Sequence, residues 1–146
     1  MKRHTSLAPL SRQHHGALIL AQLLKKGAPA YKGLPTDIDG KAAYAVQFYN
    51  NELLPHFETE EQVIIQKIKG IHTGLDLLSN EILEDHKALR ILFNSISNHP
   101  DLATHLDYIG CTLEMHIRKE ERAFFPLIQT RCSEGLLKEI AQALTA

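Results

Sequence analysis

Two stretches of this chain repeat one pattern, His56-Phe57-Glu58-Thr59-Glu60-Glu61 and His116-Ile117-Arg118-Lys119-Glu120-Glu121. Each reads H-x-x-x-E-E. A step of four residues turns an α-helix by about 40° beyond a full circle, so the histidine and the first glutamate of each stretch share one helix face. The second glutamates, Glu61 and Glu121, lie about 100° further round. They are predicted to point towards a helix flank or towards solvent.

The shared face of each stretch coincides with an apolar stripe. His116 and Glu120 continue a series of apolar residues spaced three or four apart: Leu102, Leu106, Ile109, Leu113 and Leu127. His56 and Glu60 are bracketed in the same way by Tyr49, Leu53 and Val63. The sequence therefore places two carboxylates in a hydrophobic seam, where each costs on the order of several kcal/mol unless it is paired or binds a metal.

Two further histidines fall on apolar stripes of their own. His86 stands in the series Leu75, Leu78, Ile82, His86, Leu89, Phe93, Ile96. His14 stands in the series Leu7, Leu10, His14, Ala17, Ala21, Leu24. The neighbouring His15 lies about 100° away, and turning it inward would bring Gln22 and Lys25 into core positions. The stripe favours His14 as the inward residue, with His15 as the alternative.

The inward histidines and glutamates together form a candidate metal site. Its predicted ligands are His14 (or His15), His56, Glu60, His86, His116 and Glu120. Imidazole nitrogens and carboxylates suit iron and manganese, whereas the two cysteines lack metal-binding spacing. The repeated pattern has two-fold pseudo-symmetry, so we expect two metals about 3.5–4 Å apart, bridged by the two glutamates. Without metal, the proton affinity of the two buried carboxylates should rise.

Helical periodicity extends over four long segments. They cover residues 6–26, 37–69, 74–98 and 100–131, and a short amphipathic segment follows from Ser133 to Leu144. Short connections containing Gly and Pro imply antiparallel neighbours. The predicted fold is all-α: an up-down-up-down antiparallel four-helix bundle with a short C-terminal helix, forming a single domain over residues 1–146.

Local signals predict where these helices begin and bend. Asp37 is a candidate N-cap, and Pro100 is predicted in the first turn of its helix. Pro55 and Pro126 fall inside predicted helices, where a proline removes one backbone hydrogen bond. At Pro55 the helix is expected either to break in two or to kink beside a functional site.

Composition excludes several classes of function. The net charge is −1 over 146 residues, which gives no electrostatic reason to bind nucleic acid or an anionic membrane. The longest apolar run, Ala17 to Ala21, is too short to span a bilayer, and the first 15 residues contain no signal-peptide stretch. Two cysteines, Cys111 and Cys132, make no disulfide framework, so the expected compartment is the cytoplasm.

Common catalytic patterns are not found either. The sequence contains no phosphate-binding loop, nucleotide fingerprint or Ser-His-Asp set. Ferritin-like di-iron bundles use Glu-x-x-His pairs, and no such pair occurs here.

These motifs, in this order, resemble the hemerythrin-like, or HHE cation-binding, family. The resemblance covers essentially the whole chain and rests on four strings: His14-His15-Gly16-Ala17-Leu18, the His56 to Glu61 stretch, Asp85-His86, and the His116 to Glu121 stretch with Phe125-Pro126. It implies a four-helix bundle around an oxo- or hydroxo-bridged pair of non-haem iron ions. Family activities include oxygen binding, oxygen or iron sensing, and repair of iron–sulfur clusters.

The chain departs from two branches of that family. Oxygen carriers have a second histidine one turn beyond the first on the third helix, where this chain has Arg90. Four inward histidines therefore remain, two for each iron. The cysteine-bearing N-terminal region of the repair proteins is not seen before the first helix.

Three hypotheses for function follow. The leading one is a cytoplasmic di-iron protein that binds O2, NO or a related diatomic for sensing, storage or stress response, and is a ligand-binding protein rather than a catalyst. The alternative is a di-iron enzyme, either peroxidase-like with peroxide as substrate or a repair protein, in which Tyr49 could be a redox group. A plain interaction bundle is the third, and it predicts no stoichiometric metal.

Overall fold

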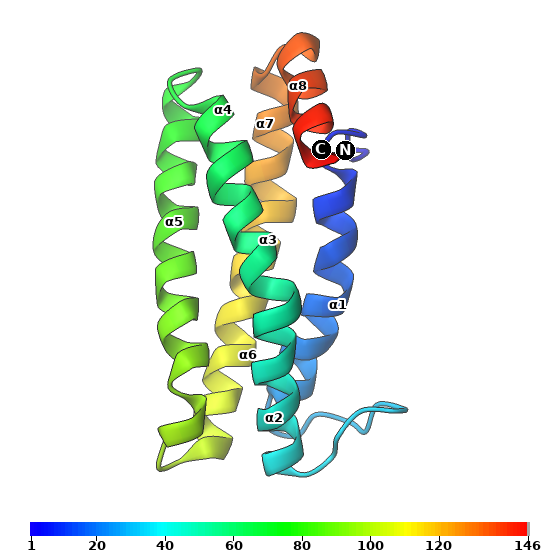
Figure 1. Cartoon of the computed structure of the whole chain (residues 1–146), viewed down its shortest axis with the longest axis vertical. Coiled ribbons are helices and arrows are strands. Elements are labelled where there is room, and N and C mark those ends of the chain that lie inside the picture. Colours follow the sequence, from blue (N-terminus) through cyan, green and yellow to red (C-terminus); the bar gives the residue numbers. More distant parts are fainter. Residues whose placement is uncertain (146) are drawn as a thin grey trace.

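The computed structural model describes residues 1–145, in which helices are joined by turns and loops and no β-strand occurs. Four long helical segments lie side by side, and a short helix packs near the chain termini (Figure 1). In chain order the elements are α1 (Ala8–Leu24), α2 (Ile38–Phe48), η1 (Tyr49–Leu53), α3 (Leu54–Thr59), η2 (Glu60–Ile65), α4 (Gln66–Ile68), α5 (Thr73–Asn94), η3 (Ile96–Asn98), α6 (Leu102–Lys119), η4 (Glu120–Phe124), α7 (Phe125–Arg131) and α8 (Glu134–Thr145). The predicted all-α fold class is confirmed.

The chain passes through both internal prolines without leaving the helical conformation. Residues 38–68 form one helical segment, and residues 102–131 form another. A π turn precedes each proline: the Leu54 N–H bonds to the Tyr49 carbonyl before Pro55, and the Phe125 N–H bonds to the Glu120 carbonyl before Pro126. In each π turn the backbone hydrogen bond spans five residues instead of four. The change occurs next to the proline, which has no N–H to donate. Pro55 therefore does not break its helix.

Side chains cap the N-termini of α2 and α6. The Asp37 carboxylate accepts a hydrogen bond of 3.0 Å from the Gly40 N–H, as expected for an N-cap. The prediction for Pro100 is wrong, because α6 begins only at Leu102. Its cap is Asp101, whose carboxylate accepts from a backbone N–H one turn on, so Pro100 precedes the helix.

Two apolar clusters fill the interior. One joins α1, α2, α5 and α6 and includes Leu20, Leu89 and Ile109. The other lies towards α4, α7 and α8 and includes Ile64 and Phe124. The buried histidines and glutamates occupy positions between these clusters along each helix. The bundle therefore has a polar layer held between two hydrophobic ones.

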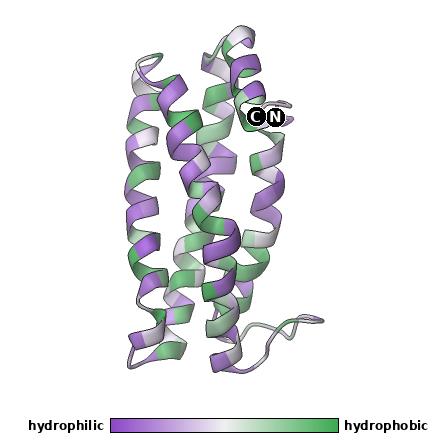
Figure 2. Ribbon diagram, viewed as in Figure 1, coloured by the Kyte–Doolittle hydropathy of each residue, from purple (hydrophilic) through white to green (hydrophobic). Residues whose placement is uncertain are grey.

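Polar and apolar residues alternate along every long helix (Figure 2). Within residues 1–145, no helix combines the length and the apolar character needed to cross a membrane.

At Gly110, α6 lies close to the backbone of α1. A Cβ atom there would stand 2.5 Å from the Ala21 carbonyl oxygen. Gly110→Ala should therefore lower the free energy of unfolding by about 1–3 kcal/mol, because the backbones must move apart. At Gly135 in α8, the nearest atom to an added Cβ is 3.9 Å away. Gly135→Ala should be neutral or stabilising by up to about 1 kcal/mol. Urea denaturation measures both, and equal changes would contradict this packing.

Candidate metal centre

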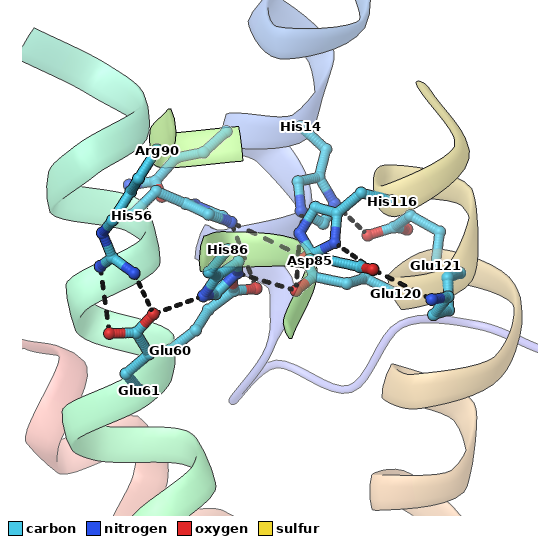
Figure 3. A network of polar contacts seen from close by, with 12 residues as sticks. His14, His56, Glu60, Glu61, Asp85, His86, Arg90, His116, Glu120 and Glu121 are labelled. Atoms are coloured by element: carbon cyan, nitrogen blue, oxygen red, sulfur yellow. Dashed lines mark hydrogen bonds and ion pairs between the residues drawn. The ribbon is translucent and has the colours of Figure 1, made fainter. Parts of the chain in front are cut away.

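The structure brings the six predicted ligands into one buried layer (Figure 3). Their exposed fractions are His14 4%, His56 6%, Glu60 0%, His86 0%, His116 3% and Glu120 0%. His15 is exposed at the surface of α1. The apolar periodicity of α1 therefore selects His14, because a helix that buries Leu10 and Ala17 must also bury the residue between them on that face.

Glu60 lies between two imidazole rings. Its Oε2 is 3.2 Å from His56 Nε2, and its Oε1 is 3.1 Å from His86 Nε2. One carboxylate thus offers a separate oxygen to a histidine of its own helical segment and to a histidine of α5.

Glu120 has the matching arrangement. Its Oε1 is 2.8 Å from His14 Nε2, and its Oε2 is 3.4 Å from His116 Nε2. Two groups of donors result, His14 with His56 and His86 with His116, and both groups share Glu60 and Glu120. Within each group the four donor atoms lie within 4.8 Å of one another. Each buried cluster can hold a metal ion.

Several inward atoms of this layer have no hydrogen-bond partner within residues 1–145. They are the Nε2 atoms of His56, His86 and His116, both carboxylate oxygens of Glu60, and Oε2 of Glu120. Buried polar atoms are normally satisfied, and leaving one unsatisfied costs about 1–3 kcal/mol. Each of these oxygen and nitrogen atoms can coordinate a cation through a lone pair. The residues therefore fit a metal ion.

The outward nitrogen of each ring is held by a second side chain. The Nδ1 atoms of His14, His86 and His116 bond to carboxylates, and that of His56 bonds to an amide. The distances are 2.7 Å from His14 to Glu121, 2.7 Å from His86 to Glu61, 2.9 Å from His116 to Asp85 and 2.5 Å from His56 to Gln13. A proton on Nδ1 leaves the lone pair on Nε2, facing the cluster.

The second glutamates of the two motifs have a function that the sequence did not predict. Glu61 and Glu121 lie at helix flanks, as expected, but they are half-buried and bonded to histidines. The outermost contacts are cationic: Arg90 donates to Glu61 at 2.8 and 3.1 Å, and Lys119 donates to Asp85 at 3.0 Å. The repetition of the second glutamate in both motifs could have indicated this role. The histidine that each glutamate contacts lies on a different helix, however, so the sequence could not name it.

Both inner glutamates are the first residues of π segments. Glu60 begins η2 and Glu120 begins η4. A π turn inserts extra backbone into one helical turn and often occurs at functional sites. Here it lies at equivalent places in the two motifs, so the local helix geometry is repeated along with the residues.

In the metal-free cluster, imidazoles control the ionisation of Glu120. Burial raises the pKa of Glu120, but attraction to His116 and the close approach of the His116, His14 and His56 imidazoles hold it well below its ordinary value. The expectation of a raised carboxylate pKa is therefore wrong for Glu120, because it counted burial and the other glutamate but not the surrounding imidazoles. Burial lowers the pKa of His56 and of His116, but the nearby carboxylates raise each to about 10: those of Glu60 and Glu120 for both rings, and that of Asp85 for His116 as well.

A small cavity adjoins the cluster on the side of α1 and α3. It has a volume of about 20 Å³, enough for one water-sized molecule. Its walls include His14, His56, His116 and Gln13, together with apolar side chains such as Ala17. The cavity therefore reaches both histidines of one donor group and only one histidine of the other.

Two other histidines and Tyr49 lie outside the donor layer. His105 is buried, and its Nε2 donates to the Leu92 carbonyl at 2.8 Å while its ring stacks on His99. His72 caps α5 through the Gly74 N–H. Tyr49 stacks on Phe93 with ring centroids 4.8 Å apart and does not border the cavity, so it is a core residue.

Comparisons of the chain with protein-family models, with curated proteins and with solved structures found no match. The fold and the site by themselves define a helical protein with buried His/Glu clusters that can hold metal ions.

The metal-free protein should become less stable as the pH rises from 6.5 to about 10. Folding raises the pKa of His56 and of His116 from 6.5 to about 10, so their contributions are complete below pH 6.5 and are lost as the pH rises through 10. The thermal midpoint of chelator-treated protein should fall across this window. His56→Gln should flatten the fall, and His15→Gln at the surface should preserve it. A midpoint independent of pH in this window would contradict these ion pairs.

Proposed function

We propose that this chain is a non-haem di-iron protein of the hemerythrin type, an up-down-up-down antiparallel four-helix bundle whose single domain spans residues 1–146. One observation carries the proposal. Glu60 and Glu120 each present one oxygen to the His14/His56 group and the other to the His86/His116 group. Two carboxylates shared between two pairs of imidazoles are the donor set of a bridged two-metal site.

The donor types support iron as the physiological metal. Each group offers two imidazole nitrogens and two carboxylate oxygens, which suit iron or manganese, and none of the six side chains is a thiolate. The two cysteines, Cys111 and Cys132, are free and lie outside the clusters. Free thiols persist in reducing compartments, which supports a cytoplasmic location as part of the proposal.

The size of the cavity supports a small ligand. A space of about 20 Å³ beside His14 and His56 suits a small molecule such as O2, NO or a peroxide. When bound, the iron pair would supply ligand coordination and electron transfer. The protein residues orient the imidazoles, exclude bulk water from the layer and hold protons on the outward nitrogens. We therefore propose ligand binding for sensing, storage or stress response rather than turnover of an organic substrate.

Metal analysis together with absorption spectroscopy tests the proposal. Protein expressed with added iron should contain two irons per chain and show near-ultraviolet bands of a bridged diferric pair. Addition of NO or of H2O2 to the reduced protein then separates a diatomic binder from a peroxidase-like catalyst. Protein that contains no stoichiometric metal would favour the plain interaction bundle.

His14→Ala and His15→Ala should differ in metal content. His14 faces the cluster and His15 is exposed, so His14→Ala should lose at least one of two metal equivalents while His15→Ala retains both. Plasma emission analysis of both variants, purified with added iron, measures the difference. The reverse result would mean that α1 is rotated relative to the structure described here.

Ala17→Val should weaken NO binding without removing iron. Ala17 borders the cavity, and two additional methyl groups would occupy much of a space of about 20 Å³. Ala45→Val is the matched control, because Ala45 is equally buried in α2 but does not border the cavity. NO titration of the reduced proteins, followed by absorption, should show weaker binding only for Ala17→Val. Equal affinities in both variants would rule out this cavity as the ligand position.

A further inference from the structure

The outward partners of the four imidazoles are not equivalent. His86 and His116 both bond to carboxylates, those of Glu61 and Asp85. In the other group, His14 bonds to a carboxylate but His56 bonds to the neutral amide of Gln13. The two donor groups share the same inner glutamates and differ in this outer contact.

The carboxylates are also held more firmly than the amide. A bidentate contact from Arg90 fixes Glu61, and Lys119 fixes Asp85. Arg3 donates to the Glu121 carboxylate at 3.2 Å, and Ser11 donates to it at 2.7 Å.

Gln13 has no comparable support. It is exposed on α1, the only hydrogen bond of its side chain within residues 1–145 is the one to His56, and it lines the small cavity. One of the four imidazoles is thus held by a solvent-exposed neutral side chain at the cavity wall.

This difference affects how strongly each group binds a cation. A carboxylate on the outer ring nitrogen makes the inner nitrogen a stronger donor and fixes the ring orientation, and loss of such a partner costs about 10–100-fold in metal affinity. A neutral amide provides the orientation but less of the charge. The His86/His116 group therefore combines two carboxylate-supported donors, and the His14/His56 group has one.

On the basis of the proposed metal site, we infer that the two positions bind divalent metal with unequal affinity and that Gln13 sets the difference. The His86/His116 position fills first and keeps its ion. The His14/His56 position beside the cavity fills second and exchanges its ion with solvent. Gln13 is a positioning residue that acts through His56. At limiting metal the protein would contain one ion per chain, and occupancy of the second position would follow the supply of free cation.

Stepwise titration with Fe²⁺ under anaerobic conditions, in competition with a chromophoric chelator, tests this inference on the full chain. The native protein should bind two ions in separate steps whose dissociation constants differ by about tenfold or more. His56→Ala should remove the weaker step and keep the stronger one, and His86→Ala should remove the stronger step.

Substitution of Gln13 distinguishes the outer contact from other causes. Gln13→Glu should strengthen the weaker step by about tenfold and leave the stronger step unchanged, which narrows the gap. Gln13→Ala should weaken only the weaker step. Gln66→Glu adds the same charge at an exposed site on α4 that makes no contact with a histidine ligand, so it should change neither step.

Two results would overturn the inference while leaving the metal site in place. These are two steps of equal affinity in the native protein, and a gap that Gln13→Glu leaves unchanged. Failure to bind Fe²⁺ at all would instead contradict the metal site proposed above. Circular dichroism of each variant distinguishes a change in affinity from loss of the fold.

Discussion

The burial of two carboxylates constrains the rest of this structure. Glu60 and Glu120 have no exposed surface and lie between two apolar clusters. A lone buried carboxylate costs on the order of several kcal/mol, so each must be surrounded by groups that favour its charge. Imidazoles do this in the metal-free chain, and those of His116, His14 and His56 hold the pKa of Glu120 low despite its burial. A pair of cations in the same layer would satisfy the same carboxylates and also the inward nitrogens that have no partner.

The same constraint extends outward to the surface of the bundle. Each imidazole presents Nε2 to the carboxylates only if Nδ1 has a partner elsewhere, and the flanks of the helices supply one for every ring. Three of these partners are charged and are neutralised in turn by Arg3, Arg90 and Lys119. The polar layer thus runs from the centre of the bundle to solvent as a chain of alternating charges, and each member depends on the next.

The two sides of this layer differ in access as well as in charge. Beside His86 and His116, the outer carboxylates of Glu61 and Asp85 are paired with Arg90 and Lys119. Beside His14 and His56, the wall contains a neutral glutamine and encloses the small cavity. A ligand-binding function and an exchangeable ion both require one accessible position, and both features lie on the same side. The position inferred above to hold its metal less firmly is therefore the one that borders the cavity.

The sequence by itself determined the helical fold class and identified the six buried histidines and glutamates as candidate ligands. It could do so because helical periodicity is a local property: a residue four positions from another on an apolar stripe must share its burial, which selected His14 over His15. Tertiary structure alone decided what the second glutamates bond to, that Arg90 clamps Glu61, and that His56 is paired with an amide. These contacts join residues on different helices. They form only at a particular rotation and spacing of those helices, which no short stretch of sequence determines.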